Sequence, residues 1–252
     1  MSGPHTHALM VHGHSPVHVL PAKVKLVAML AFVLAVVATP RERMWAFAVH
    51  ALLVLAVVVL AELPFGHVLK RMSVEIPFVV FAFFLPLLGG APDVDVFGFS
   101  VSQEGLWGAW NILAKGSLGV AASVILVSTT EIPAILRALS ELKVPAAMVA
   151  IAGFMVRYLD VIAGELKRMR TAMAARGYSA RGIGQAKVLA VAGGALFIRS
   201  YERGERVHQA MLARGFTGVL PRIRTPEVTV TQWSMGLSIP LAAWSITSVS
   251  LL

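Results

Sequence analysis

Five long apolar runs divide this sequence, and they constrain its fold more than any other feature. The runs are Lys23–Thr39, Trp45–Leu63, Glu75–Gly90, Leu106–Val127 and Gln232–Leu252. Runs of this length are typical of helices that span a bilayer, where helices satisfy every backbone polar group internally. Hydrophobic residues make up 57% of the 252 residues, more than a soluble domain can hide. The sequence therefore predicts an all-α polytopic membrane protein with about five transmembrane helices.

Positive charge is concentrated between the fourth and fifth runs. The net charge is +9, and 15 of the 22 Lys and Arg residues lie between residues 137 and 224. Basic segments beside membrane helices mark the cytoplasmic side, so this segment is expected there. The N-terminus is expected there too, because Lys23 and Lys25 begin the first run. Arg41 and Arg43 fall on the expected outer side of this multi-pass cell-membrane protein, against the same rule.

The predicted organisation follows from these two patterns. Residues 91–105 contain no basic residue and alternate like two short strands around Gly98, which is typical of an outer loop. Two further helices have apolar halves near 146–156 and 188–198, about 11 residues each, too short to span a bilayer. The predicted parts are a His-rich N-terminal leader at 1–22, four transmembrane spans within 23–130, a cytoplasmic coupling-helix region at 131–217, a linker at 218–231 and a C-terminal transmembrane helix at 232–252.

The leader is unusually rich in histidine. It holds five of the eight histidines, namely His5, His7, His12, His14 and His18. Imidazole binds Co, Ni, Cu and Zn near neutral pH, so metal sequestration is one interpretation, and a disordered tail with chance His content is the other. The chain has no Cys, which excludes disulfides and thiolate-bound metal.

Two stretches within the basic segment are near-copies of each other. Arg168–Ser179 and Arg206–Thr217 match at an offset of 38, with Arg, Ala, Met, Ala, Arg and Gly in place, then an aromatic and a hydroxyl residue. Each copy has the features of a helix end, because good helix formers lead to a last-turn Arg and then to Gly. Two helices of one plan predict two equivalent docking sites for a pair of like subunits.

Helical spacing places the repeated residues on one stripe. The stripe holds Leu166, Met169, Ala172, Met173 and Arg176 in the first copy and Val207, Ala210, Met211 and Arg214 in the second. Small and flexible apolar residues suit a helix that docks into a groove, and the Arg fork can clamp a partner's carboxylate. Ordinary amphipathic helix ends with good C-caps are the alternative.

Catalytic motifs are absent. The nucleotide-binding pattern Gly-x-x-x-x-Gly-Lys-[Ser/Thr] does not occur, since Lys115-Gly116-Ser117 has the residue types in another order. His50, His67 and His208 lack metal-ligand spacing; His50 and His67 are interpreted as structural. We therefore expect a non-enzymatic membrane scaffold with no cofactor of its own.

Several short motifs carry a resemblance to one family. They are Thr129-Thr130, Val144-Pro145, Phe154-x-x-Arg157-Tyr158, Glu165-x-x-Arg168 and the two Ala-Arg-Gly signatures at 175–177 and 213–215. From about Pro16 to Gly218 the chain resembles the transmembrane T component of energy-coupling-factor (ECF) transporters, of the cobalt type called CbiQ-like. The family's Asp-Pro-Arg-x-Lys stretch reads Pro21-Ala22-Lys23-Val24-Lys25 here, so any role of that Asp cannot be carried over. The cobalt assignment rests on resemblance around Ser15–His18, Trp107–Lys115 and Ser200–Arg203.

The resemblance implies the T subunit of an ABC importer, which transmits ATP-driven motion from two ABC ATPase subunits to a substrate-binding membrane subunit. The cargo would be cobalt, or alternatively nickel or a vitamin, and ATP would be bound by the partner subunits. The implied ATPase-coupling residues are Ala175, Arg176, Gly177, Ala213, Arg214 and Gly215, with support from Glu165, Arg168, Met173, Arg206 and Met211.

Two other classes of function make different predictions. A self-contained secondary carrier predicts ionisable residues inside the spans, and Lys115 alone qualifies. Lys115 itself either snorkels towards one face or contacts a partner membrane subunit. A basic nucleic-acid binder would need an aromatic-basic platform, which the chain lacks, so no nucleic-acid partner is expected.

Overall fold

The computed structural model describes residues 13, 15–88, 93–96, 99–178, 186–218 and 227–251. Helices dominate these residues, and two short strands form a single hairpin. Contacts group the chain into two units. Among the described residues, we call those from 13 to 138 with 227–251 the transmembrane unit, and those from 139 to 218 the helix-pair unit. The domain boundaries drawn from the sequence stay predictions.

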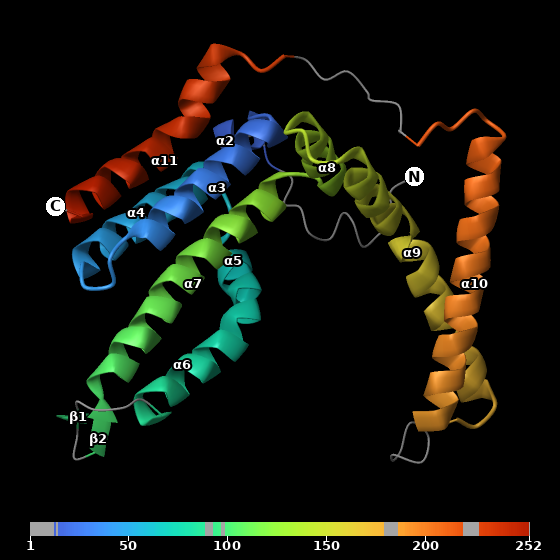
Figure 1. Cartoon of the computed structure of the whole chain (residues 1–252), viewed down its shortest axis with the longest axis horizontal. Helices are drawn as coiled ribbons and strands as arrows, with labels where there is room; N and C mark the ends of the chain where they lie inside the picture. The colour runs from blue at the N-terminus through green and yellow to red at the C-terminus, as the bar shows by residue number, and fades with distance from the viewer. Residues whose placement is uncertain are drawn as a thin grey trace. The chain divides into compact units, whose positions relative to one another are not determined.

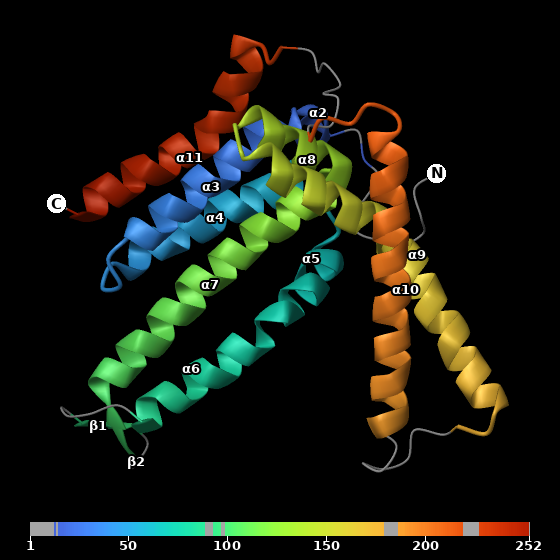
Figure 2. The same cartoon turned by 45° about the vertical axis from the view of Figure 1, so that its right-hand side comes forward.

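The transmembrane unit contains helices that match all five predicted spans, which confirms the all-α membrane class. Its elements are α2 (Pro16–Val19), α3 (Ala22–Ala38), α4 (Met44–Leu60), α5 (Phe65–Met72), the 3-10 helix η1 (Ser73–Glu75), α6 (Ile76–Leu88), β1 (Asp93–Val96), β2 (Phe99–Ser102), α7 (Gln103–Thr129), the start of α8 (Ile132–Glu141) and α11 (Val230–Leu251). Helices α3, α4, α7 and α11 lie side by side, and α5 and α6 run along α7 (Figure 1 and Figure 2). The predicted short strands form an antiparallel hairpin that pairs Asp93 with Ser102 and Val96 with Phe99.

The helix-pair unit contains α9 (Ala146–Ala175) and α10 (Ala186–Leu212). Three helices of the described chain are long and apolar enough to cross a membrane, namely α7, α9 and α11, and α4 is a shorter apolar helix. The apolar window of α9 has a mean hydropathy of 1.7 over 18 residues. The expectation of an apolar part of about 11 residues in α9 was therefore wrong, because the isolated charges of Arg157 and Asp160 do not end the apolar stretch.

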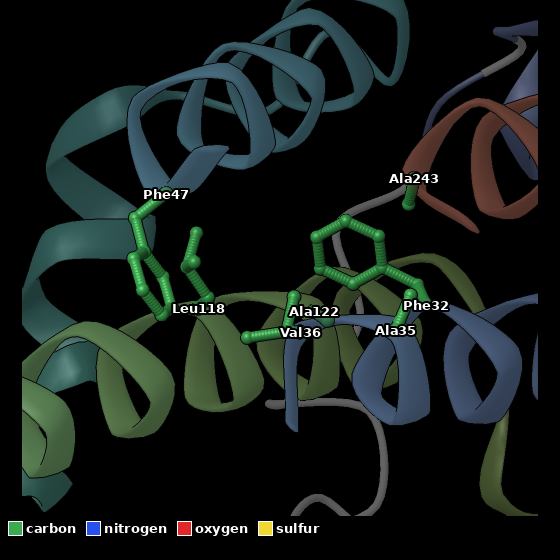
Figure 3. Packing of buried hydrophobic residues seen from close by; sticks show 7 residues of the cluster. All are labelled: Phe32, Ala35, Val36, Phe47, Leu118, Ala122 and Ala243. Atoms are coloured by element: carbon green, nitrogen blue, oxygen red, sulfur yellow. The ribbon is translucent and has the colours of Figure 1, made fainter. Parts of the chain in front are cut away.

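The core of the transmembrane unit lies where four helices meet. Figure 3 shows its buried side chains, which are Phe32, Ala35 and Val36 of α3, Phe47 of α4, Leu118 and Ala122 of α7, and Ala243 of α11. Small residues at such contacts allow membrane helices to approach closely. His50 is fully buried beside this cluster, with its ring 5.9 Å from that of Phe32 and its Nε2 3.4 Å from the Ala243 carbonyl oxygen. This position agrees with a structural role for His50.

Helices α6 and α7 pack closely because of one glycine. Ser102 caps the start of α7, where its Oγ accepts a hydrogen bond from the Gly105 N–H at 3.2 Å. A Cβ on Gly105 would collide with the Leu85 carbonyl oxygen and with Pro86 Cα. Glycine at this position therefore lets the backbones of α6 and α7 touch.

Charged groups near the α3–α4 turn and along α7 have partners. Arg41 contacts Glu42 at 3.0 Å and Glu104 at 3.4 Å, and these two carboxylates offset the charge that opposed the positive-inside rule. The pKa of Glu42 lies below its ordinary value because its own backbone N–H and the Arg41 guanidinium stabilise the carboxylate. Lys115 donates to the Val37 carbonyl oxygen at 2.8 Å, so its ammonium reaches the end of α3.

Glu75 corrects one sequence expectation. Its side chain is buried, and its Oε1 accepts a hydrogen bond from Ser117 Oγ at 2.8 Å. Ser117 lies near the middle of α7, so Glu75 is an ionisable residue inside the bundle in addition to Lys115. The sequence placed it at the start of the third span, but η1 carries it deeper against α7.

Lys25 joins three segments at the C-terminal end of α7. It is 9% exposed, and its Nζ donates to the carbonyl oxygens of Thr129 at 2.8 Å and His18 at 3.2 Å and to Thr130 Oγ1 at 3.2 Å. These bonds satisfy carbonyl groups that the end of a helix leaves open. Lys25 therefore fixes α2 and the end of α7 to α3.

Candidate coupling site

Helix α9 ends in a cap that explains the first Ala-Arg-Gly motif. The Tyr178 N–H donates to the Met173 carbonyl oxygen at 3.0 Å, and the Gly177 N–H donates to that of Ala174 at 3.0 Å. Gly177 has a φ of +77°, in the left-handed region that favours glycine. This is the Schellman arrangement, in which a left-handed residue lets the next N–H groups satisfy the last carbonyl groups of a helix.

Helix α10 ends in the same way. The Phe216 N–H donates to the Met211 carbonyl oxygen at 3.0 Å, and the Gly215 N–H donates to that of Leu212 at 2.9 Å. Gly215 has a φ of +80°. Every donor and acceptor lies 38 positions after its counterpart in α9. The sequence repeat is therefore also a repeat of backbone geometry.

The burial pattern repeats at the same offset. In α9 the half-buried positions near the end are Glu165, Met169, Met173 and Tyr178, and in α10 they are Arg203, Val207, Met211 and Phe216. Within the predicted stripe, Met169, Met173, Val207 and Met211 are half-buried, and Leu166, Ala172, Ala210 and both motif arginines are exposed. The docking role of the stripe stays a prediction.

Glu165 connects the two helices. Its Oε1 accepts from Arg199 Nη1 at 3.1 Å, and its Oε2 accepts from Arg203 Nη2 at 2.9 Å. The Glu165 side chain is 13% exposed. The support role of Glu165 stays a prediction. The sequence had grouped Glu165 with Arg168, whereas its contacts in the structure are with Arg199 and Arg203 of α10.

The two helices run in opposite directions. Glu165 lies 10 residues before the end of α9, and its partners lie 13 and 17 residues after the start of α10. Figure 2 shows this crossing, with the last turn of α9 and the first turn of α10 at the same end of the pair. The motifs that contain Arg176 and Arg214 therefore follow opposite ends of the pair, and both arginines are exposed.

The remaining predicted site residues are placed as follows. Ala175 ends α9, and Ala213 follows the last residue of α10. Arg168 and Arg206 are exposed, and Arg206 lies 3.8 Å from Glu202 on its own helix. His18 lies close to Ser15, with 2.7 Å between Nδ1 and Oγ. His5, His7, His12 and His14 lie outside the described residues, and the described ones contain no group of three or more potential metal ligands.

A family model supplies the decisive comparison. The model of the cobalt transport protein family CbiQ matches residues 13–226. The chain belongs to the CbiQ family. This membership confirms the resemblance seen in the motifs and identifies the chain as a membrane component of the transporter type.

One named relative agrees with this assignment, and two further relatives are uncharacterized. Over 244 residues the chain is 28% identical to the energy-coupling factor transporter transmembrane protein EcfT 1 of Listeria monocytogenes, covering 90% of this chain and 88% of that protein. It is also 28% identical over 180 residues and over 153 residues to two uncharacterized proteins of Methanocaldococcus jannaschii, covering 68% and 59% of this chain. The chain spans 62% and 56% of the length of these two archaeal relatives.

Proposed function

We propose that this CbiQ family member is the energy-coupling T subunit of an ECF-type ABC importer. In this proposal α9 and α10 are the coupling helices, and each Ala-Arg-Gly cap docks on one ATPase subunit. A separate membrane subunit binds the solute, which we propose to be cobalt. The ATPase subunits bind ATP, so this chain transmits motion and performs no chemistry itself.

The observation that carries the proposal is the pair of matched caps at opposite ends of one helix pair. Both have the same hydrogen bonds and the same left-handed glycine, and each presents an exposed Arg. A guanidinium fork binds a carboxylate with two parallel hydrogen bonds. Two identical presentations suit two like partners, each of which offers an acidic groove to one helix end.

The relatives support the transporter class. The name of the Listeria relative states an energy-coupling factor transporter, and the family model names cobalt transport. A subunit without a nucleotide-binding motif needs an energy source, and ATPase partners provide one. The basic segment that contains α9 and α10 favours the cytoplasmic side, where ATP is available.

The docking test reverses both motif charges. We expect R176E/R214E to lose copurification with the ATPase subunits and to lower ATP-dependent uptake to background. Each introduced carboxylate would then face the acidic groove of its ATPase subunit and be repelled by it. Each single variant should lose part of the binding, and the two losses should be similar. The matched control is R170E, which makes the same change at an exposed Arg of α9 outside the motif. Normal uptake by R176E/R214E would refute the proposal.

A second measurement separates the importer from a secondary carrier. Liposomes that contain this chain alone should not accumulate radioactive cobalt, with or without an ion gradient. Liposomes that contain the full complex should do so only with ATP inside. Uptake by the isolated chain would favour the carrier.

Cargo and orientation are tested separately. Accumulation of nickel instead of cobalt by the full complex would contradict the cargo assignment and leave the coupling role standing. For orientation, the natural absence of Cys allows a single A174C variant. A membrane-impermeant maleimide should label A174C only after cells are permeabilised, and labelling of intact cells would overturn the cytoplasmic placement.

A further inference from the structure

Glu165 and Arg203 occupy equivalent positions in the repeat. They are separated by the same offset of 38 that relates the two motifs, and they contact each other at 2.9 Å. When a residue contacts its own counterpart across two related helices, the two-fold axis that relates the helices passes close to that contact. The Glu165–Arg203 pair therefore marks the pseudo-two-fold axis of the helix pair.

This axis lies midway between the two motifs. Arg176 follows Glu165 by 11 residues, and Arg214 follows Arg203 by 11 residues. Eleven residues extend about 17 Å along a helix, so the two caps are equally distant from the crossing. The charges at the axis differ in sign, with Glu on α9 and Arg on α10, which allows the two equivalent positions to attract each other.

We propose that Glu165 is a positioning residue that locks the crossing of α9 and α10, so that the two Ala-Arg-Gly caps move as one rigid body. This inference rests on the proposed coupling function of those caps. One carboxylate uses one oxygen for Arg199 and the other for Arg203. Without it, the two guanidinium groups, which lie four residues apart on α10, would lose the carboxylate that binds them to α9.

The hydrogen bonds of Glu165 matter because little apolar packing holds α9 and α10 together. No residue of α9 is buried within the structure, so apolar packing between the two helices contributes little to their alignment. Glu165 and Arg203 are the better-shielded members of the cluster, with side chains 13% and 32% exposed against 60% for Arg199. Charged hydrogen bonds are directional and roughly twice as strong as neutral ones, so they fix the register of the crossing.

Two spin labels measure directly how well the crossing of α9 and α10 is fixed. Labels at A174C and L212C, equivalent exposed positions in a chain without native Cys, report the separation of the two helix ends. Each position lies nine residues beyond the axis pair, which places the labels up to about 27 Å apart along the helices. The measurement is made on the full chain in lipid nanodiscs, with and without the ATPase subunits.

We expect the wild-type background to give one narrow distance and E165Q to lose it in favour of a broad distribution. The inverted pair E165R/R203E should restore the narrow distance, because the carboxylate would then come from α10 and would lie between the new guanidinium on α9 and that of Arg199. The matched control E202Q removes the Glu202–Arg206 contact, which lies within α10 alone, and should leave the distance unchanged.

Transport gives the second readout. E165Q should still bind the ATPase subunits, because both caps are intact, and it should lose uptake per ATP hydrolysed. An unchanged distance in E165Q would overturn the inference, and so would a broad distribution that the inverted pair fails to narrow. Failure of the coupling function itself would appear in R176E/R214E, and the label distances measured without ATPase subunits do not depend on it.

Discussion

Replacing Gly177 or Gly215 with Ala tests whether the two caps are built alike. Both glycines have left-handed φ values, +77° and +80°, and open space where a Cβ would lie. Steric collision with neighbouring residues is therefore no factor at either position, and the whole cost comes from the backbone conformation. We expect both substitutions to weaken the cap and to do so equally.

The size of the effect follows from the conformation. A residue with a Cβ in the left-handed region costs roughly 1–2 kcal/mol relative to its ordinary conformation. Since about 1.4 kcal/mol corresponds to a factor of ten in an equilibrium constant, the closed cap should become roughly 5 to 30 times less favoured. The bonds at risk are those from the Tyr178 and Phe216 N–H groups to Met173 and Met211.

Hydrogen exchange of these two amides is the assay. In G177A the Tyr178 amide should exchange roughly 5 to 30 times faster, and in G215A the Phe216 amide should do the same. Each variant should leave the amide of the other cap unchanged, because the two caps lie at opposite ends of the pair.

The control is G204A in the interior of α10. Gly204 also has open space around its Cβ position, but its φ is not in the left-handed region. Alanine in a helix interior is favoured over glycine by about 1 kcal/mol, so G204A should slow local exchange. Equal behaviour of all three alanine variants would refute the argument from the left-handed caps.

Three further substitutions test the transmembrane unit. G105A should destabilise the protein by about 1–3 kcal/mol, the cost of an overpacked contact, because its Cβ meets the backbone of α6; thermal unfolding measures this loss. The control is G119A in the same helix, where a Cβ has open space. An equal loss in G119A would contradict the packing explanation. K25M should destabilise by about 1–3 kcal/mol, since it leaves the Thr129 carbonyl oxygen without its Nζ donor, and unchanged thermal stability would show that water replaces the ammonium. S102A should cost about 1 kcal/mol through loss of the helix cap, measured as faster exchange of the Gly105 amide.

Local chemistry made much of the site predictable. The caps follow from Gly, Arg and good helix formers within a few residues, and these interactions need no knowledge of the rest of the fold. The apolar runs likewise predict the spans, because a bilayer demands length and apolarity. The matched offset of Gly177 and Gly215 already indicated equivalent geometry, and the hydrogen bonds confirm it.

Tertiary contacts were harder to predict. The partners of Glu165 lie 34 and 38 residues further along the chain, so their identity depends on the direction and register of α10. The offset that relates Glu165 to Arg203 was present in the sequence, but only a crossing near this point turns equivalence into contact. The depth of Glu75 depends in the same way on how α5 and η1 enter the bundle.

Lys25 has a mechanical consequence for the chain that leaves the transmembrane unit. Two of its three hydrogen bonds hold Thr129 and Thr130 against α3, and α8 starts at Ile132, two residues later. The segment that leads into α8 is therefore fixed to α3 where it begins. A pull or a twist that arrives along α8 therefore acts on α3 as well as on α7, and the hydrogen bonds from Lys25 oppose unwinding of the last turn of α7.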